Sequence, residues 1–295
     1  MPITAEQRAL RKHRLGASDM PAVMGLVANM SPRDVWASKV YDVQDTGTDA
    51  TAAGNALEST LVAYAQDRLG HPVEPNVYCD TGEILAANLD GLCRALRIGV
   101  EGKTHGIVGP ALEAELWGDD ETDQVPDRVV VQATTQMICA EIDEVVVPAL
   151  VGGRGFRLYR LRRDEDLVAA IMDEAEEFWV KYVLTRREPP GAPPRLDLIR
   201  RIVRQEGKVV SIPSAVLREA ADARALRKAA KKRAEMADAA LYAAIGDATT
   251  GECADGRVTI KTVSRKEYTC KACSFQQMTF RLDPALAAAI EDSAD

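Results

Sequence analysis

The sequence has few aromatic side chains, few histidines and no long apolar run. Only 5% of its 295 residues are aromatic, and the three tryptophans are far apart, so no base-stacking platform is expected and the tryptophans are assigned to packing. The three histidines have no ligand-like spacing and receive no catalytic role. These residues are Trp36, Trp117, Trp179, His13, His71 and His105.

Several segments and motifs that define other protein classes are also missing. No apolar segment approaches the ~18–20 residues that a membrane span needs, and the charged start lacks a following apolar segment of the signal-peptide type. No Walker-type glycine loop is present, so ATP-driven activity is not indicated. We therefore expect a soluble protein without a membrane partner.

The six cysteines are scattered along the chain, which favours reduced thiols over disulfides. Cys270 and Cys273 form a CxxC motif, but no second pair accompanies it, so a zinc site is not favoured. Reduced thiols predict a protein of a reducing cytoplasm.

Charge is distributed unevenly. The formal net charge is −8, which is the wrong sign for a protein that coats nucleic acid by bulk electrostatics. Between Arg195 and Arg233, however, there are twelve Lys or Arg residues and four Asp or Glu residues, a local charge of +8. This segment indicates either a phosphate-rich partner at one place or a solvated helix face.

The hydrophobic pattern of the first 190 residues predicts an α/β (α+β) fold, with helices flanking a mixed sheet. Apolar residues recur at helical spacing in six segments. Period-two patterns predict three strand segments, and a Gly-rich turn predicts a hairpin after them. The predicted helices are 4–14, 18–26, 31–41, 55–70, 126–142 and 164–187, and the predicted strands are 72–80, 83–93, 97–104 and the hairpin 144–163.

A proline-rich segment, residues 189–194, predicts a linker. It divides the chain into a domain over residues 1–190 and an extension over residues 191–295. The extension is predicted to contain a long, exposed, Ala-rich basic helix and a short β-like tail, at residues 213–245, 257–263 and 276–282.

The sharpest chemical signal is Asp90, followed eleven residues later by Glu101-Gly102-Lys103. Residues 101 and 103 of a strand point to the same face, so a carboxylate and an ammonium project side by side. If Asp90 ends the neighbouring strand, two carboxylates and a lysine converge. Two close carboxylates repel unless a cation lies between them, and oxygen ligands suit Mg²⁺ or Mn²⁺.

Such a site can hydrolyse phosphodiesters, because a metal ion activates water and a lysine orients the nucleophile or the phosphate. The alternative is structural: Glu and Lys alternate on many exposed strands, and Asp-Gly is an ordinary turn. These residues alone leave both interpretations open.

Nine segments, in this order and spacing, resemble the YqaJ-like viral recombinase family, the lambda-exonuclease-type branch of the restriction-endonuclease-like PD-(D/E)xK superfamily. The resemblance covers about residues 10–190. The segments are RLGASDMPAVMGL (14–26), SPRDVWASK (31–39), GNALE (54–58), ANLDGL (87–92), VEGKT (100–104), ELWG (115–118), VPDRVVVQATTQM (125–137), VPALVGGRGFRLYRLRRD (147–164) and EFWVKYV (177–183).

The resemblance implies a restriction-endonuclease-like core and a Mg²⁺-dependent, two-metal exonuclease. Such an enzyme degrades one strand of linear duplex DNA from the five-prime end and leaves a three-prime overhang for single-strand-annealing recombination. The implied partners are double-stranded DNA ends, a single-strand annealing protein and two further copies of the chain in a trimeric ring. The implied location is the cytoplasm of a bacterial or phage-infected cell.

The roles of individual residues follow from the same resemblance. Asp90, Glu101 and the Gly102 carbonyl match metal ligands, and Glu58 matches the acidic residue that serves the second metal. The others match catalytic or substrate-binding positions: Lys103 as catalytic lysine, Gln132 as the glutamine behind the active sheet with Gln136 as a weaker companion, and Arg14 with Ser18 as a grip on the terminal phosphate.

An Arg and a hydroxyl near a helix N-terminus also form an anion site on physical grounds, although Ser18 or Asp19 is equally suited to cap that helix. Two features depart from the family pattern: Leu89 replaces the proline of the superfamily name, and Arg14 and Ser18 are closer together than their counterparts. The alternatives are a non-catalytic DNA-binding accessory and an endonuclease of the same fold.

Overall fold

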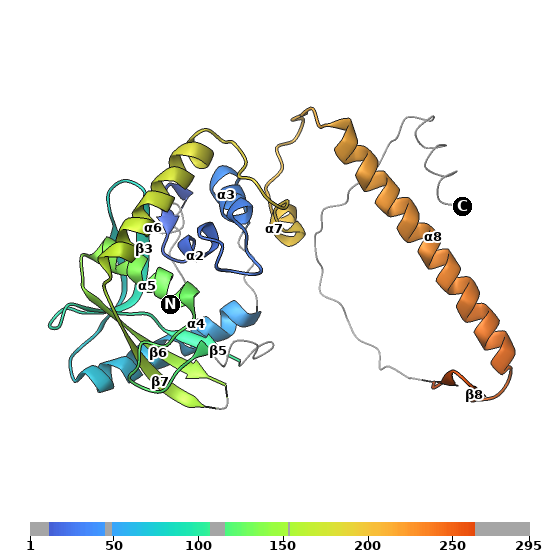
Figure 1. Ribbon diagram of the computed structural model, residues 1–295, viewed down its shortest axis with the longest axis horizontal. Coiled ribbons are helices and arrows are strands. Elements are labelled where there is room, and N and C mark those ends of the chain that lie inside the picture. Colours follow the sequence, from blue (N-terminus) through green and yellow to red (C-terminus); the bar gives the residue numbers. More distant parts are fainter. Residues whose placement is uncertain (1–11, 45–48, 107–115, 153, 263–295) are drawn as a thin grey trace. The chain divides into compact units, whose positions relative to one another are not determined.

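The computed structural model describes residues 12–44, 49–106, 116–152 and 154–262 (Figure 1). The chain forms two compact units, divided between Arg204 and Gln205, so the first includes the proline-rich segment. Most of the predicted helix 4–14, the predicted tail strand 276–282, and Cys270 with Cys273 lie outside the described residues.

The first unit is built on a seven-stranded mixed sheet, which confirms the predicted fold class. Its central path is β1-β3-β4-β6-β5, while β2 pairs with β3 and β7 pairs with β6. The β1–β3, β4–β6 and β5–β6 pairs are parallel, and the others are antiparallel. The strands are β1 (Leu15–Gly16), β2 (Glu74–Asp80), β3 (Leu85–Cys93), β4 (Ile98–Val100), β5 (Lys103–His105), β6 (Glu144–Val151) and β7 (Gly155–Arg162).

Strands β4 and β5 are two halves of one interrupted strand. Both run parallel to β6 in the same register, with Ile98 opposite Glu144 and Lys103 opposite Ala149. The interruption is Glu101-Gly102, where the Glu101 N–H still donates to the Val146 carbonyl at 3.0 Å. The two residues singled out in the sequence therefore lie where the strand is broken.

The described helices of this unit lie in the predicted segments, except for the last one. That helix, Leu196–Arg200, was not predicted, because five residues are too few to show a helical period. The helices are α2 (Met20–Val23), α3 (Pro32–Val40), α4 (Asp49–Leu69), α5 (Asp127–Ala140), α6 (Glu165–Phe178) with a π-helical end (Trp179–Leu184), and α7 (Leu196–Arg200). Helix α4 begins six residues before its predicted start at residue 55. Its first residues include alanines, which are strong helix formers, and they outweigh the polar composition that predicted a loop.

Two separate cores cover the two faces of the sheet. Along β6, Val145 and Val147 pack into the large core with residues of α5, whereas Val146 packs into a smaller core with Ala65 of α4. Helices α5 and α4 thus lie on opposite faces (Figure 1). Burial on both faces explains why β6 is almost continuously apolar.

A capping box fixes the start of α3 and ties it to α7. The Ser31 side chain accepts from the Asp34 N–H, and an Asp34 carboxylate oxygen accepts from the Ser31 N–H at 2.8 Å. The other Asp34 oxygen accepts from the Arg195 N–H, next to α7, at 2.7 Å. Burial raises the pKa of Asp34, but the backbone hydrogen bonds from Ser31 and Arg195 outweigh it, so the pKa is lowered.

Replacing Asp34 with Ala is expected to reduce the free energy of unfolding by about 1–3 kcal/mol at pH 7, because three donors lose a charged acceptor. A lowered folded-state pKa means that the charged carboxylate stabilises the fold above its unfolded pKa of about 3.9 and loses this effect as pH falls through the folded value. Urea denaturation at pH 7, 5 and 3.5 checks this. If Asp34→Ala lowers the free energy of unfolding as much at pH 3.5 as at pH 7, this role of the Asp34 charge would be contradicted.

The second unit contains a 32-residue helix, α8 (Ser214–Ile245), and a hairpin of β8 (Thr250–Cys253) and β9 (Gly256–Thr259). The helix confirms the prediction for residues 213–245, and Ala221 is its one buried residue. Strand β8 was not predicted, because Thr-Gly-Glu-Cys lacks an alternating apolar pattern. In the described part of the chain, no helix is long and apolar enough to cross a membrane.

The cysteines that the structure describes are all free thiols. They are Cys79, Cys93, Cys139 and Cys253.

Candidate active site

The broken strand brings Asp90, Glu101 and Lys103 together. Strand β3 pairs antiparallel with β4, with Gly91 opposite Val100, so Asp90 lies beside Glu101. Asp90 is inside β3 rather than at its end. The Lys103 ammonium donates to Glu101 Oε1 at 2.7 Å, so residues 101 and 103 project side by side.

Two glutamines of α5 hold the Glu101 carboxylate. Gln132 Nε2 donates to Glu101 Oε1 at 2.6 Å, and Gln132 Oε1 accepts from Lys103 Nζ at 2.8 Å, which closes a three-residue ring of hydrogen bonds. Gln136, one turn later, donates to Glu101 Oε2. Gln136 is fully buried and Glu101 is only 5% exposed, so this carboxylate is fixed in orientation.

Asp90 lacks comparable compensation. Its Oδ2 accepts from the Gly102 N–H at 2.7 Å. Burial and the neighbouring Glu101 carboxylate raise the pKa of Asp90 to about 8, against the lowering effects of the Gly102 N–H and Lys103. The Glu58 carboxylate, on α4, also raises this pKa. The ionised Asp90 carboxylate therefore destabilises the fold when no metal cation is bound beside it.

The donor set fits a hard divalent cation. Asp90, Glu101 and the Gly102 carbonyl offer oxygen ligands, and Mg²⁺ is usually bound through one or two carboxylates, with water and substrate phosphate completing its shell. Within the described residues, no three His, Cys, Asp or Glu side chains form a metal-holding group. Glu58 is half-buried and lies outside any such group, although its charge acts on Asp90.

Gly102 allows close packing at the break. A Cβ on this residue would lie 3.1 Å from Leu61 of α4 and 3.3 Å from Asp90 Oδ2, which is tighter than most Cβ contacts. The glycine therefore lets α4 approach and leaves the Asp90 carboxylate undisturbed.

The two predicted phosphate-binding residues lie near each other in the chain but have different environments. The Arg14 guanidinium donates to the carbonyls of His13 and Gly82. Ser18 and Gln132 line the same small cavity of about 20 Å³. Because Gln132 is hydrogen-bonded to Glu101, this cavity lies next to the hydrogen-bonded group of Glu101, Lys103 and Gln132. Asp19, not Ser18, is the N-cap of α2, and it makes no side-chain capping bond.

Asn88 is a candidate that the sequence reasoning missed. It lines the same cavity as Ser18 and Gln132, and its Oδ1 is buried without a hydrogen-bond partner among the described residues. Such an atom is costly unless water or a ligand reaches it. Its position two residues before Asp90 on a strand is the signal that could have identified it.

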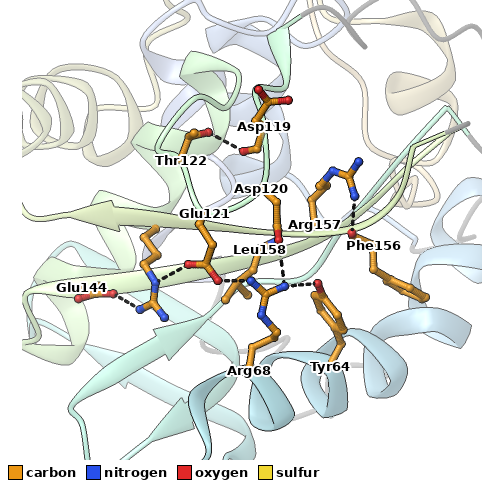
Figure 2. A network of polar contacts seen from close by, with 11 residues as sticks. Tyr64, Arg68, Asp119, Asp120, Glu121, Thr122, Glu144, Phe156, Arg157 and Leu158 are labelled. Atoms are coloured by element: carbon orange, nitrogen blue, oxygen red, sulfur yellow. Dashed lines mark hydrogen bonds and ion pairs between the residues drawn. The ribbon is translucent and has the colours of Figure 1, made fainter.

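A charged network anchors α4 to the sheet (Figure 2). Arg68 of α4 donates to Tyr64 at 2.6 Å and to Asp120 at 3.1 Å, and it also pairs with Glu121. Asp120 in turn accepts from the Leu158 N–H of β7 at 2.7 Å. The network fixes the helix that carries Glu58 and Leu61.

Replacing Arg68 with Met is expected to lower the free energy of unfolding by about 1 kcal/mol, because one guanidinium joins two carboxylates and a phenol in a network. The matched control is Lys181→Met, which breaks the exposed pair with Glu177 and should cost less than ~0.5 kcal/mol. Urea denaturation at low and high salt measures both. Equal losses for the two variants would show that the network adds nothing.

The fold and the site together define a class. The mixed sheet flanked by helices agrees with the restriction-endonuclease-like core that the resemblance implied, and Asp90, Glu101 and Lys103 meet at its broken strand. Residues 7–143 match the model of the YqaJ-like viral recombinase domain, which confirms the resemblance found in the sequence.

Similar proteins agree with this match. An uncharacterized protein, YqaJ, of Bacillus subtilis (strain 168) is 24% identical over 186 residues, which is 61% of this chain and 56% of that protein, so the match spans about half of the relative's length. The alkaline exonuclease LHK-Exo from Laribacter hongkongensis is 20% identical with a TM-score of 0.51, over 62% of this chain and 94% of that chain. Its complex with dAMP gives a TM-score of 0.52 at the same identity. The likeness to these structures shows that this chain shares the fold of LHK-Exo.

Proposed function

We propose that this protein is a divalent-metal-dependent deoxyribonuclease that degrades one strand of linear double-stranded DNA, from five-prime to three-prime, and leaves a three-prime overhang for annealing recombination. The observation that carries the proposal is the meeting of Asp90, Glu101 and Lys103 at the break between β4 and β5. The family match and the exonuclease fold support it.

In this proposal Asp90, Glu101 and the Gly102 carbonyl hold Mg²⁺ or Mn²⁺, and Glu58 serves a second ion. When bound, such ions activate water and neutralise charge on the phosphoryl group. The remaining chemistry belongs to the protein. Gln132 and Gln136 keep the Glu101 carboxylate in one orientation, so its oxygens need no rearrangement during the reaction.

Lys103 is proposed to orient the nucleophile or to contact the scissile phosphate. An ammonium has three N–H donors, and Lys103 gives two of them to Glu101 and Gln132. These two bonds fix the position of the nitrogen, while the third N–H can point to the substrate. Lys103 is 22% exposed, so it is accessible from solvent.

The resemblance extends the proposal to the substrate and partners. Arg14 and Ser18 are proposed to grip the terminal phosphate of a duplex end, with Ser18 at the small cavity beside Gln132. A trimeric ring would confine positive potential to a channel and so reconcile DNA binding with a net charge of −8. A single-strand annealing protein is the proposed recipient of the overhang.

Incubation with linear and covalently closed circular duplex DNA, each with Mg²⁺, tests the function. The proposal predicts that the linear DNA alone is degraded, with loss of a five-prime label before a three-prime label. Cutting of both substrates would indicate an endonuclease. Cleavage of neither would indicate a non-catalytic accessory protein.

A further inference from the structure

One side of α8 carries a concentrated row of cations in the second unit. Arg224, Arg227, Lys228, Lys231 and Lys232 follow the spacing i, i+3, i+4, i+7, i+8, which places them on one side of a helix. We name these five residues the basic face. It spans about 12 Å along the axis, at 1.5 Å per residue.

The charges of the basic face are poorly neutralised by the helix itself. Positions three and four residues away from Arg227 and Lys228 hold only Ala, Arg or Lys, so like charges are neighbours. Each such pair destabilises a helix by about 0.2–0.5 kcal/mol. Lys231 pairs with Glu235 at 3.7 Å, and this pair contributes little because both side chains are largely exposed.

The surroundings of the basic face leave it accessible. All five cations are exposed, and the residues between and beside them are mostly alanines, whose short side chains do not screen it. A straight row of exposed cations that repel one another is stabilised by an extended polyanion, because each contact removes repulsion and releases counterions. Packing against an apolar protein surface would instead bury these charges.

We propose that the basic face binds the phosphate backbone of duplex DNA without sequence preference. Duplex DNA carries one negative charge per about 1.7 Å of its axis, so a 12 Å row of cations can meet several phosphates. The inference rests on the proposed function for the identity of the polyanion. It gives the second unit a role in holding DNA, while the chemistry stays with Asp90, Glu101 and Lys103 of the first unit.

The test compares two triple variants with the same change in net charge. The first replaces Lys228, Lys231 and Lys232 with Gln on the basic face. The second, a matched control, replaces three exposed cations outside the basic face, and Gln preserves helix propensity at the positions that lie in α8. The control positions are Arg187, Lys208 and Arg233.

Affinity of the full-length protein for a fluorescent linear duplex is measured by anisotropy in EDTA between 50 and 300 mM salt. The basic-face triple is expected to bind about 10- to 100-fold more weakly near 0.15 M salt, and its slope of log K against log salt should fall by about 2–3. The control triple should keep the wild-type slope to within about 0.5. Equal slopes for the two triples would overturn the proposal and leave an acidic protein partner as the alternative.

Cleavage is scored separately, so the two proposals can fail independently. With Mg²⁺ and saturating DNA, the basic-face triple should retain the wild-type turnover rate. If the wild-type protein binds DNA through this face but cleaves no substrate, the proposed nuclease function fails and this inference stands. Far-UV circular dichroism confirms that α8 remains helical, and a loss of helicity in the first triple alone would attribute the weaker binding to folding and overturn the inference.

Discussion

A Lys103→Ala protein is expected to bind linear duplex DNA as the wild-type protein does but to cleave it about a hundred- to a thousandfold more slowly. The substitution removes the ammonium that lies 2.7 Å from Glu101 and 2.8 Å from Gln132, and with it the donor proposed to meet the nucleophile or phosphate. Losses of this size are typical when one preorganised electrostatic donor is removed.

The fold should survive this change, because Gln132 and Gln136 still donate to the Glu101 carboxylate. Single-turnover cleavage of an end-labelled duplex with Mg²⁺ gives the rate, and anisotropy in EDTA gives the binding. The control is Lys181→Ala, an exposed lysine outside the cluster, which should cleave normally. Wild-type cleavage by Lys103→Ala would refute the role assigned to Lys103.

An Asp90→Asn protein is expected to lose cleavage and yet to be more stable than the wild-type protein when no metal is present. Burial and Glu101 raise the pKa of Asp90 to about 8 in the fold, far above its unfolded value of about 3.9. Between these two pKa values the folded state keeps Asp90 protonated. The contribution of Asp90 to the stability of the wild-type protein therefore falls as pH rises from about 4 to about 8.

The amide removes this cost, and an uncharged residue in place of a poorly compensated buried charge is expected to add about 1–2 kcal/mol at pH 8–9, with the gain shrinking towards pH 5. Asn can still accept from the Gly102 N–H. Added Mg²⁺ should raise the melting temperature of the wild-type protein and leave that of Asp90→Asn unchanged.

Asp120→Asn is a control for which the opposite change in stability is expected. Burial raises the pKa of Asp120, but hydrogen bonds from the Leu158 N–H and Arg68 outweigh it and lower the pKa, so its charge stabilises the fold and its loss should destabilise it. Calorimetry in EDTA across pH 5–9 compares the variants. If both substitutions shift the free energy of unfolding in the same direction, the claim that ionised Asp90 destabilises the metal-free fold is wrong.

Local patterns in the sequence were sufficient for most of the fold. Period-two segments identified β2 and β3, and a Gly-rich turn identified the β6–β7 hairpin. Helical spacing identified α5 despite its β-branched start. The start of α4 was missed because its first residues include polar residues, which predicted a loop although alanines stand among them. Strand β8 was missed because pairing with β9 through a short turn, rather than its own residues, makes it a strand.

The site was only partly accessible from the sequence. The proximity of Glu101 and Lys103 follows from strand geometry, but the register that puts Asp90 beside Glu101 depends on the pairing of β3 with β4. Gln136 was ranked as a weaker companion, yet it is fully buried and bonded to Glu101. The anchoring of α4 by Arg68 joins residues more than fifty positions apart, and no local pattern encodes such a contact.

The most direct test of the central claim is a crystal of the wild-type protein soaked in Mn²⁺ and measured at the manganese absorption edge. The account predicts an anomalous peak at the site that Asp90, Glu101 and the Gly102 carbonyl would form, and no such peak in Asp90→Asn. Well-ordered Asp90 and Glu101 side chains without a peak between them, at Mn²⁺ concentrations that support cleavage, would contradict it.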